Sequence, residues 1–312
     1  MIKKLFTTLV LLIALNGFTQ TATEFYDRAY EYYADGKYKD CLKILDMAIR
    51  RDAITEHYLL KAETYEKLKQ YQKVLETLNE GLSMYPEDPW LYNQRGFFYQ
   101  RIDKPDPAIR DYGLAIKFAE ENDSLVATFT LNRGTAKSSK RDFQGAYDDY
   151  MVAYEYDSTN ISVLNNLAMV CSEIGKDDEV LGYLLKVVEA EPEAWFAYGN
   201  IGFAYQERGE YEKSIEYFNI VLEDNPDEPY ALNNRSYSKF KLGDYEGALE
   251  DVDRSIKLFS ANAFAYRNRA LIYLELGKTK KACEDIAAGL EQGFTQRYGK
   301  ELINLQRKHC SE

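Results

Sequence analysis

One pattern of about 34 residues recurs eight times between Ala22 and Gln296, with little drift in its spacing. Its copies begin at Ala22, Thr55, Pro89, Ala127, Ile161, Trp195, Pro229 and Ala263. A unit of this size cannot bury its apolar surface alone, so copies in series must stack against their neighbours. The repeat therefore restricts the chain to a continuous array of packed units, with no interior site comparable to an enzyme cleft.

The apolar residues inside each copy follow helical spacing, because they recur at i, i+4 and i+7. Counted from the start of a copy, positions 4, 8 and 11 form one stripe and positions 20, 24 and 27 form another. Glycine at position 15 permits a left-handed helix end, and proline at position 32 stops the second helix. The glycines are Gly36, Gly175, Gly209, Gly243 and Gly277, and the prolines are Pro86, Pro192 and Pro226. Each copy therefore predicts two amphipathic helices joined by a turn.

The sixth copy carries the pattern most clearly. It reads Tyr198-x-x-Ile201-Gly202-x-x-Tyr205, then Gly209-Glu210-Tyr211, Ser214-x-x-x-Phe218 and Asn225-Pro226. This resembles the tetratricopeptide repeat family, and the resemblance covers nearly all of the chain after residue 21. It implies an all-α fold, a right-handed α-solenoid of helix-turn-helix units that ends in a C-terminal capping helix.

The copies suggest four parts of the chain. We expect a signal peptide at 1–19, units 1–3 at 20–126, units 4–8 at 127–296, and a tail at 297–312 whose capping helix runs from Arg297 to Lys308. The third copy marks the central seam, since it runs 38 residues with 120–123 in the extra stretch and has 103–107 in place of a glycine turn. Two explanations of this break fit the sequence. Units 1–3 and units 4–8 make different contacts, or the extra residues are a tolerated insertion.

The first 20 residues have the composition of a secretory signal. Lys3 and Lys4 precede an apolar run from Leu5 to Leu15, and Gly17 and Thr19 offer small residues for cleavage. Because a membrane-spanning helix needs roughly 20 apolar residues, we expect cleavage and no membrane span afterwards. The short signal is typical of Gram-negative bacteria and predicts a periplasmic protein, with full secretion as the alternative.

Export makes the four cysteines relevant, although none has the spacing of a metal site. Cys41 and Cys171 take core positions about four repeats apart and cannot meet. Cys283 lies early in the last copy's second helix, and Cys310 ends the predicted capping helix. A simple hairpin count places Cys283 nearer Asn304 than Cys310, which disfavours a disulfide, because Cα atoms more than ~7 Å apart cannot be bridged.

Charge and histidine content argue against two classes of function. The net charge is −12, whereas nucleic-acid binding needs a basic stripe that displaces counterions from phosphates. The two histidines, His57 and His309, have no nucleophile or metal partner at motif spacing. We therefore expect no enzymatic activity, no cofactor and no metal, and a protein or peptide as the partner.

Arginine and aspartate occur together in half of the copies. Position 7 is arginine and position 23 is aspartate in the pairs Arg95–Asp111, Arg133–Asp149, Arg235–Asp251 and Arg269–Asp285. Copies five and six lack both, and Arg28 with Ile44 is an exception. Because the two residues come and go together, we predict a structural ion pair between the two helices of one unit.

Binding is expected on the face of the first helix that does not pack. At 100° per residue, positions 2, 6, 9 and 13 lie opposite the core stripe. Position 6 is asparagine in the last five copies, at Asn132, Asn166, Asn200, Asn234 and Asn268. A side-chain amide can both donate and accept, so these residues can pair with the backbone of an extended peptide of any sequence. They resemble the asparagine ladder of some tetratricopeptide peptide binders, although asparagine is also a frequent default at this position.

Bulky aromatic residues share this face. They are Trp90, Phe196, Tyr230 and Phe264 at position 2, and Tyr30, Phe97, Phe203 and Tyr237 at position 9. Five amides contribute only ~2.5–7.5 kcal/mol, against ~4–15 kcal/mol for lost freedom on association, so affinity must come from such anchors. Packing between neighbouring helices is the alternative. The predicted peptide-binding set combines the five asparagines with Phe196, Phe203, Tyr230, Tyr237 and Phe264.

Two functions fit these features. The first is a non-catalytic protein- or peptide-binding scaffold of the bacterial cell envelope that holds an extended segment in its concave groove. The alternative is a structural assembly subunit that joins a larger envelope complex through its edges or convex face. The residues with which chaperone-binding members of the family clamp a terminal carboxylate do not occur in three consecutive copies. Position 13 changes from Lys67 and Arg101 to Glu173, Glu207 and Glu275, which predicts either a groove that changes sign or ordinary solvated charge.

Overall fold

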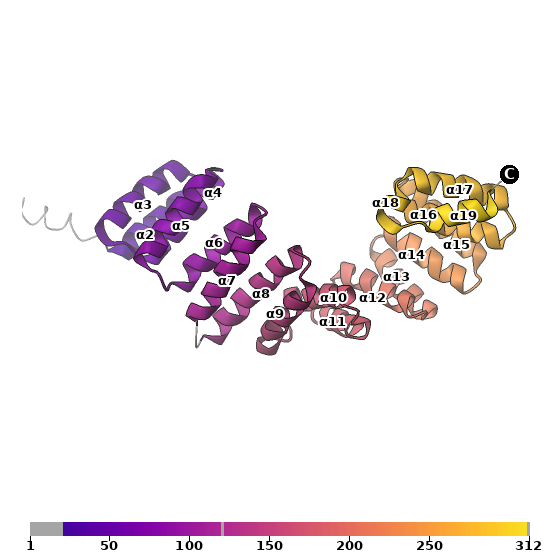
Figure 1. The fold of residues 1–312 in the computed structure, drawn as a ribbon, viewed down its shortest axis with the longest axis horizontal. Coiled ribbons are helices and arrows are strands. Elements are labelled where there is room, and N and C mark those ends of the chain that lie inside the picture. The colour runs from indigo at the N-terminus through magenta and orange to yellow at the C-terminus, as the bar shows by residue number, and fades with distance from the viewer. Residues whose placement is uncertain (1–20, 120–121, 311–312) are drawn as a thin grey trace, which may run out of the picture. The chain divides into compact units, whose positions relative to one another are not determined.

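The computed structural model describes residues 21–119 and 122–310, and all regular structure in these ranges is helical. The expected signal peptide at 1–19 lies outside the described residues. The chain falls into two compact units, an N-terminal unit that ends at Asp157 and a C-terminal unit that begins at Ser158. Within each unit, consecutive helices lie side by side in chain order (Figure 1). The all-α repeat fold is confirmed in each unit.

Eight helix hairpins make up most of the described chain. The N-terminal unit contains α2 (Ala22–Ala34), α3 (Tyr38–Asp52), α4 (Thr55–Lys67), α5 (Tyr71–Met84), α6 (Pro89–Arg101), α7 (Pro105–Ala119), α8 (Asp123–Ser139) and α9 (Phe143–Tyr156). The C-terminal unit contains α10 (Ile161–Glu173), α11 (Asp177–Ala190), α12 (Trp195–Glu207), α13 (Tyr211–Asp224), α14 (Pro229–Lys241), α15 (Tyr245–Leu258), α16 (Ala263–Glu275), α17 (Thr279–Glu291), α18 (Phe294–Tyr298) and α19 (Glu301–His309). Seven of the eight predicted starting points coincide with the first residue of a helix.

The fourth copy differs, because its first helix begins at Asp123 and not at Ala127. The side chain of Asn122 accepts a hydrogen bond from the backbone N–H of Leu125 at 3.1 Å and caps the helix there. The helix α8 therefore has 17 residues, whereas α6 and α10 have 13. Part of the extra stretch thus becomes one more helical turn.

The turn at position 15 keeps one backbone conformation in every copy, with or without glycine. The five predicted glycines have φ between 69° and 83°. Lys69, Asp103 and Arg141 take the same position in copies two to four, with φ of 57°, 56° and 65°. The array therefore imposes the left-handed helix end on these three residues, although a side chain disfavours it.

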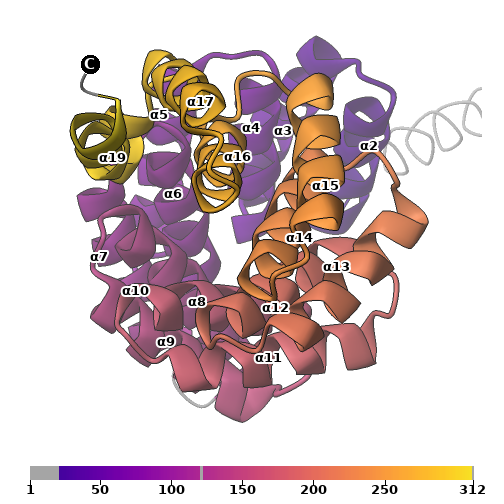
Figure 2. The same ribbon diagram turned by 90° about the vertical axis from the view of Figure 1, so that its right-hand side faces the viewer.

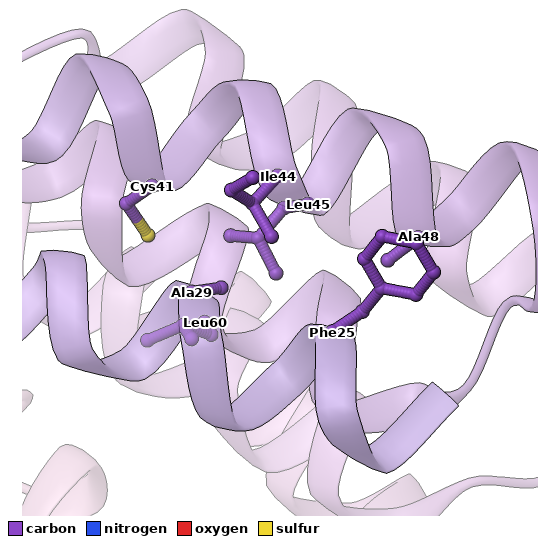
Figure 3. Packing of buried hydrophobic residues seen from close by; sticks show 7 residues of the cluster. All are labelled: Phe25, Ala29, Cys41, Ile44, Leu45, Ala48 and Leu60. Atoms are coloured by element: carbon purple, nitrogen blue, oxygen red, sulfur yellow. The ribbon is translucent and has the colours of Figure 1, made fainter. Parts of the chain in front are cut away.

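The core is assembled between copies as well as within them. Figure 3 shows the first part of it, where Phe25 and Ala29 of α2 lie with residues of α3 and with Leu60 of the next copy. The α3 residues are Cys41, Ile44, Leu45 and Ala48. Since Leu60 comes from α4, the second copy covers apolar surface that the first hairpin cannot bury alone.

The predicted arginine–aspartate pairs are confirmed in all four copies. Each arginine donates two hydrogen bonds of 2.6–2.9 Å to its aspartate, and each aspartate side chain is only 5–7% exposed. Three of the arginines also reach position 25 of the preceding copy. Their acceptors are Asn79 for Arg95, Asn219 for Arg235 and Asp253 for Arg269. The pair therefore joins two hairpins in addition to the two helices of one hairpin.

Arg133 lacks this second contact, because position 25 of the preceding copy is Gly113. A Cβ atom at Gly113 would lie 3.9 Å from a guanidinium nitrogen of Arg133. We therefore expect Gly113→Asn to raise the free energy of unfolding by about 1 kcal/mol, through a hydrogen bond to a charged group. Urea unfolding followed by circular dichroism measures this. Gly182→Asn is the matched control, since nothing lies within 4 Å of Gly182. Equal effects of the two substitutions would contradict the proposed contact.

The C-terminal segment differs from the predicted capping helix at 297–308. It forms two helices, α18 and α19, with Gly299 between them at φ 87°. The second helix packs on α17 (Figures 1 and 2) and buries Leu302 fully. Gly289 makes room for it, since a Cβ atom there would lie 2.7 Å from Leu302.

Cys283 and Cys310 form a disulfide with a Cα–Cα distance of 5.7 Å. The sequence-based expectation that Cys283 lies nearer Asn304 was wrong. It assumed one helix from Arg297, whereas the capping helix begins at Glu301, so the hairpin count started at the wrong residue. Cys41 and Cys171 are free and buried, as their core positions predicted. Burial, with Glu179 nearby, raises the pKa of Cys171 to about 12, which makes this thiol unreactive.

Candidate peptide-binding groove

A pocket opens on the first-helix face of the C-terminal unit, between α12 and α14 and above α13. Its volume is about 420 Å³. The lining residues are Trp195, Phe196, Gly199, Asn200, Phe203, Phe218, Val221, Asp224, Asn225, Glu228, Tyr230, Ala231 and Asn234. We call it the α12–α14 pocket. It brings together half of the predicted binding set, namely Phe196, Asn200, Phe203, Tyr230 and Asn234.

Three aromatic side chains of this pocket are about half open to solvent. Phe196 is 54% exposed, Phe203 is 47% exposed and Tyr230 is 55% exposed. Exposed aromatic side chains that gather around one pocket are typical of ligand-binding grooves. Tyr230 is also steadied by Phe259, with 5.8 Å between the ring centroids. The pocket therefore offers preformed apolar anchors.

The asparagines of the predicted ladder are not equivalent. Asn200 is exposed, and Asn166 and Asn234 are half-buried. The side-chain oxygen of Asn234 accepts a hydrogen bond from Asn233 at 3.1 Å. Its Nδ2 group has no acceptor among the residues that the structure describes. These positions leave at least one side of the amide open to a ligand.

Asn268 and Asn132 are instead bonded to the preceding copy. Asn268 is 4% exposed, donates to Asn233 Oδ1 at 2.9 Å and accepts from Arg267 at 2.9 Å. Asn132, in the N-terminal unit, donates to Asn93 Oδ1 at 2.9 Å. The amide of Asn268 is therefore not available to a ligand in this structure.

The residue at position 5 of the preceding copy explains most of this difference. Asn93 and Asn233 stand at position 5, and each occupies the amide at position 6 of the next copy. A third asparagine at position 5, Asn165, makes no such bond to Asn200 in the described part of the chain. In the α12–α14 pocket, position 5 is Gly199, and only a Val221 atom lies within 4.0 Å of where its Cβ would be. The missing side chain leaves both the pocket and Asn234 open.

Two predicted aromatic anchors have packing roles here. Phe264 is half-buried against Phe294 and Tyr298, with centroid distances of 5.4 and 4.2 Å, so the C-terminal segment covers it. Tyr237 is half-buried, and its ring centroid lies 6.2 Å from that of Phe240. The guanidinium of Arg267 lies 5.1 Å from the same ring centroid. Both side chains therefore pack against neighbouring parts of the protein, which is the alternative to a role as ligand anchors.

Sequence reasoning did not single out the acidic side of the pocket. Asp224 is exposed at the end of α13, and Glu228 caps α14 by accepting from the backbone N–H of Ala231. No lysine or arginine is among the residues that line the pocket. The signal that could have found these carboxylates is their place at positions 30 and 34, beside the next copy's position 2.

The described residues offer no metal site, since no group of three or more histidine, cysteine or acidic side chains is placed to hold an ion. The ring of His57 is fully buried, accepts from the N–H of Ile54 at 3.3 Å and lies 3.1 Å from the carbonyl of Ala22. Burial lowers its pKa. This histidine therefore joins two helix starts. No helix in the described ranges is long and apolar enough to cross a membrane.

Family models described as tetratricopeptide repeat match residues 56–88, 200–263 and 234–293. The chain is a tetratricopeptide repeat protein. It is 24% identical over 194 residues to the TPR repeat-containing protein YvcD of Bacillus subtilis, which covers 60% of this chain and 37% of YvcD. The chain spans less than half the length of the curated relatives that it matches. For a second relative, the match covers 18% of the relative's length.

Solved structures show the same fold at low identity. The C-terminal part of a TPR repeat-containing protein from Cytophaga hutchinsonii has a TM-score of 0.60 and 19% identity, over 78% of this chain and 99% of that one. YrrB, described as a TPR protein with an unusual peptide-binding site, has a TM-score of 0.55 and 19% identity, over 61% of this chain and 96% of its own.

Proposed function

We propose that this tetratricopeptide repeat protein is a non-catalytic scaffold that binds an extended segment of another protein. The binding site is the first-helix face of the C-terminal unit, centred on the α12–α14 pocket. The observation that carries the proposal is the pocket's combination of exposed aromatic anchors with amides that are not fully bonded. The peptide-binding site named for YrrB, which has the same fold, supports this choice.

The energies favour anchoring by side chains over pairing by amides alone. Asn166, Asn200 and Asn234 together contribute about 1.5–4.5 kcal/mol if each makes one net hydrogen bond. Association costs about 4–15 kcal/mol in lost freedom. Phe196, Phe203 and Tyr230 are about half exposed, so burying the remaining surface contributes about 0.7–1.5 kcal/mol for each side chain. A ligand that fills the pocket adds this contribution and the burial of its own apolar side chain, whereas the amides alone reach only the lower limit of the cost.

Gly199→Asn tests the site, because it places a side chain in the pocket without removing any existing contact. Asn93 and Asn233 show that asparagine at this position can also occupy the next amide. The substitution is compatible with α12, since asparagine is at least as good a helix former as glycine. We expect at least a tenfold loss of affinity, or about 1.4 kcal/mol, for peptides selected from a random library on the unmodified protein.

The control is Gly182→Asn, the same exchange at an exposed position of α11 with nothing within 4 Å. It should bind the selected peptides with unchanged affinity in calorimetric titrations. If the library yields no binders, or if Gly199→Asn binds the selected peptides as well as the control does, the α12–α14 pocket is not the binding site. A self-association or assembly defect in surface variants elsewhere would then favour the structural-subunit alternative.

We further propose that the protein works outside the cytoplasm, in the bacterial cell envelope. The Cys283–Cys310 disulfide supports this location, because such bonds persist in oxidising compartments. The expected signal peptide points the same way. N-terminal sequencing of protein released by osmotic shock should begin after residue 19, and recovery of uncut protein from the cytosol alone would refute the proposal.

A further inference from the structure

The N-terminal unit contains a second pocket, which we call the α4–α6 pocket. Its volume is about 470 Å³, and it is lined by Ile54, Thr55, Glu56, Leu59, Tyr85, Asp88 and Trp90. Six of these residues stand at positions 1, 2, 5, 31 and 34 of the second copy and position 2 of the third. The same positions of copies six and seven supply Trp195, Phe196, Gly199, Asn225, Glu228 and Tyr230 to the α12–α14 pocket. The two pockets are therefore equivalent by repeat position.

A smaller hollow of about 150 Å³ adjoins the α4–α6 pocket and extends the equivalence. It shares Leu59 and Trp90 with the pocket and adds Glu63 and Gln94. Glu63 stands at position 9 and Gln94 at position 6 of the next copy, where the α12–α14 pocket has Phe203 and Asn234. An amide side chain thus stands beside the aromatic wall in both units.

The walls of the α4–α6 pocket are held in place by contacts within the protein. Trp90 is 45% exposed, yet its other side meets Phe129 edge to face, with 5.3 Å between the ring centroids. The hydroxyl of Tyr85 donates to a backbone carbonyl at 2.7 Å. Asp88 accepts from the backbone N–H of Leu91 at 2.9 Å and from the hydroxyl of Thr55 at 2.8 Å. A ligand would meet an ordered surface and lose little affinity to ordering it.

Both pockets combine an apolar wall with negative charge. Glu56 and Asp88 line the α4–α6 pocket, and Asp224 and Glu228 line the α12–α14 pocket. No lysine or arginine is among the residues that line either of them or the adjoining hollow. Glu56 and Asp224 are exposed, and neither has an ion-pair partner in the described part of the chain. A large apolar side chain next to a lysine or arginine matches both features.

We propose that the α4–α6 pocket is a second peptide-binding site, and that each unit binds a segment with a large apolar side chain flanked by lysine or arginine. This inference rests on the proposed function and adds both a second site and a ligand chemistry. The exposed carboxylates attract the basic side chains, and the aromatic wall takes the apolar one. Each chain then binds two such segments, one in each unit.

The chain provides a separate reporter for each site. Its two tryptophans, Trp90 and Trp195, lie one in each pocket. Trp195→Phe leaves Trp90 as the only indole, and Trp90→Phe leaves Trp195. We would titrate both proteins with the capped peptide acetyl-Gly-Lys-Leu-Lys-Gly-amide, which absorbs no light in the tryptophan range. A capped Gly-Glu-Leu-Glu-Gly peptide tests charge, and Gly-Lys-Gly-Lys-Gly tests the apolar side chain.

We expect the emission of Trp90 to change and saturate with the Lys-Leu-Lys peptide, and both other peptides to bind at least tenfold more weakly. Glu56→Lys should weaken the binding seen by Trp90 by about tenfold and leave that seen by Trp195 unchanged. Glu76→Lys, an exposed position on α5, is the matched control and should change neither. Calorimetry on the unmodified protein should give two sites per chain.

Two outcomes would overturn the inference. If Trp90 stays silent and calorimetry gives at most one site, the second pocket does not bind this class of ligand. A response from Trp195 in that case would leave the proposed function standing, whereas silence of both would count against it as well. If the Glu-Leu-Glu peptide binds as tightly as the Lys-Leu-Lys peptide, the assigned ligand chemistry is wrong.

Discussion

Asp251→Ala should lower the free energy of unfolding by about 3–5 kcal/mol, because it leaves two largely buried cations without their counter-ion. Arg235 is only 19% exposed and donates two hydrogen bonds to Asp251, at 2.8 and 2.6 Å. Lys239, 20% exposed, reaches the same carboxylate at 2.8 Å. Without Asp251, two positive charges would lie close together with only about one fifth of each side chain exposed to water.

The measurement is urea unfolding followed by far-UV circular dichroism. Asp227→Ala is the matched control, since Asp227 pairs with Arg254 at the surface, where the side chains are 64% and 49% exposed. Such a pair contributes about 0–1 kcal/mol, so the control should lose little. A loss below about 0.5 kcal/mol for Asp251→Ala would show that the pair is not structurally important.

This pair is also the best example of what the sequence alone can predict. Copies of one unit within a chain serve as a substitute for an alignment, and the joint presence of arginine and aspartate at two positions indicates that their side chains meet. Helix starts are predictable for a related reason. Asp88 and Pro89, like Glu228 and Pro229, place a capping side chain and a proline at the same repeat position.

The left-handed turn shows a limit of composition. Glycine marks it in five copies, but Lys69, Asp103 and Arg141 adopt the same φ because stacking on both sides fixes the path of the chain. The preference of glycine for positive φ predicts such a turn only where packing does not impose the same conformation on another residue. In copies two to four the packing of neighbouring hairpins decides the backbone conformation.

The candidate site was only partly predictable. Helical geometry selected the face on which the α12–α14 pocket opens, and Phe196, Asn200 and Phe203 lie together there. Whether an asparagine on that face is open depends on the residue at position 5 of the preceding copy. Comparing one repeat position at a time does not reveal this dependence. Gly199 leaves a pocket, whereas Asn233 at the same position bonds to Asn268 and closes the face. Availability of an amide is thus a property of two adjacent copies.

The disulfide could not be predicted, because it depends on where the last helix begins. Gly299 separates α18 from α19. With α19 beginning after this break, the Cα atoms of Cys310 and Cys283 are 5.7 Å apart. Counting residues along one unbroken helix gives a different partner. The break at Gly299, which starts a new helix, therefore contributes to the pairing.

Replacing both Cys283 and Cys310 with serine should lower the free energy of unfolding by about 3 kcal/mol. The bond closes a loop of 27 residues, and a cross-link of that span restricts the unfolded chain by roughly this amount. In the folded state it holds α19 on α17, where Leu302 covers the apolar end of the last hairpin. We expect the C-terminal hairpin to lose hydrogen-exchange protection first, since the substitution removes the bond that holds its covering helix α19 in place.

Dithiothreitol supplies the complementary test. It should destabilise the unmodified protein by the same amount and leave the double variant unchanged, because Cys41 and Cys171 are free and buried. Unmodified protein that unfolds identically with and without the reductant would contradict a stabilising disulfide. An equal effect of the reductant on both proteins would assign its action to another group. The expected pattern, an effect only where Cys283 and Cys310 are both present, ties the stability of the repeat array's exposed end to the redox state of its surroundings.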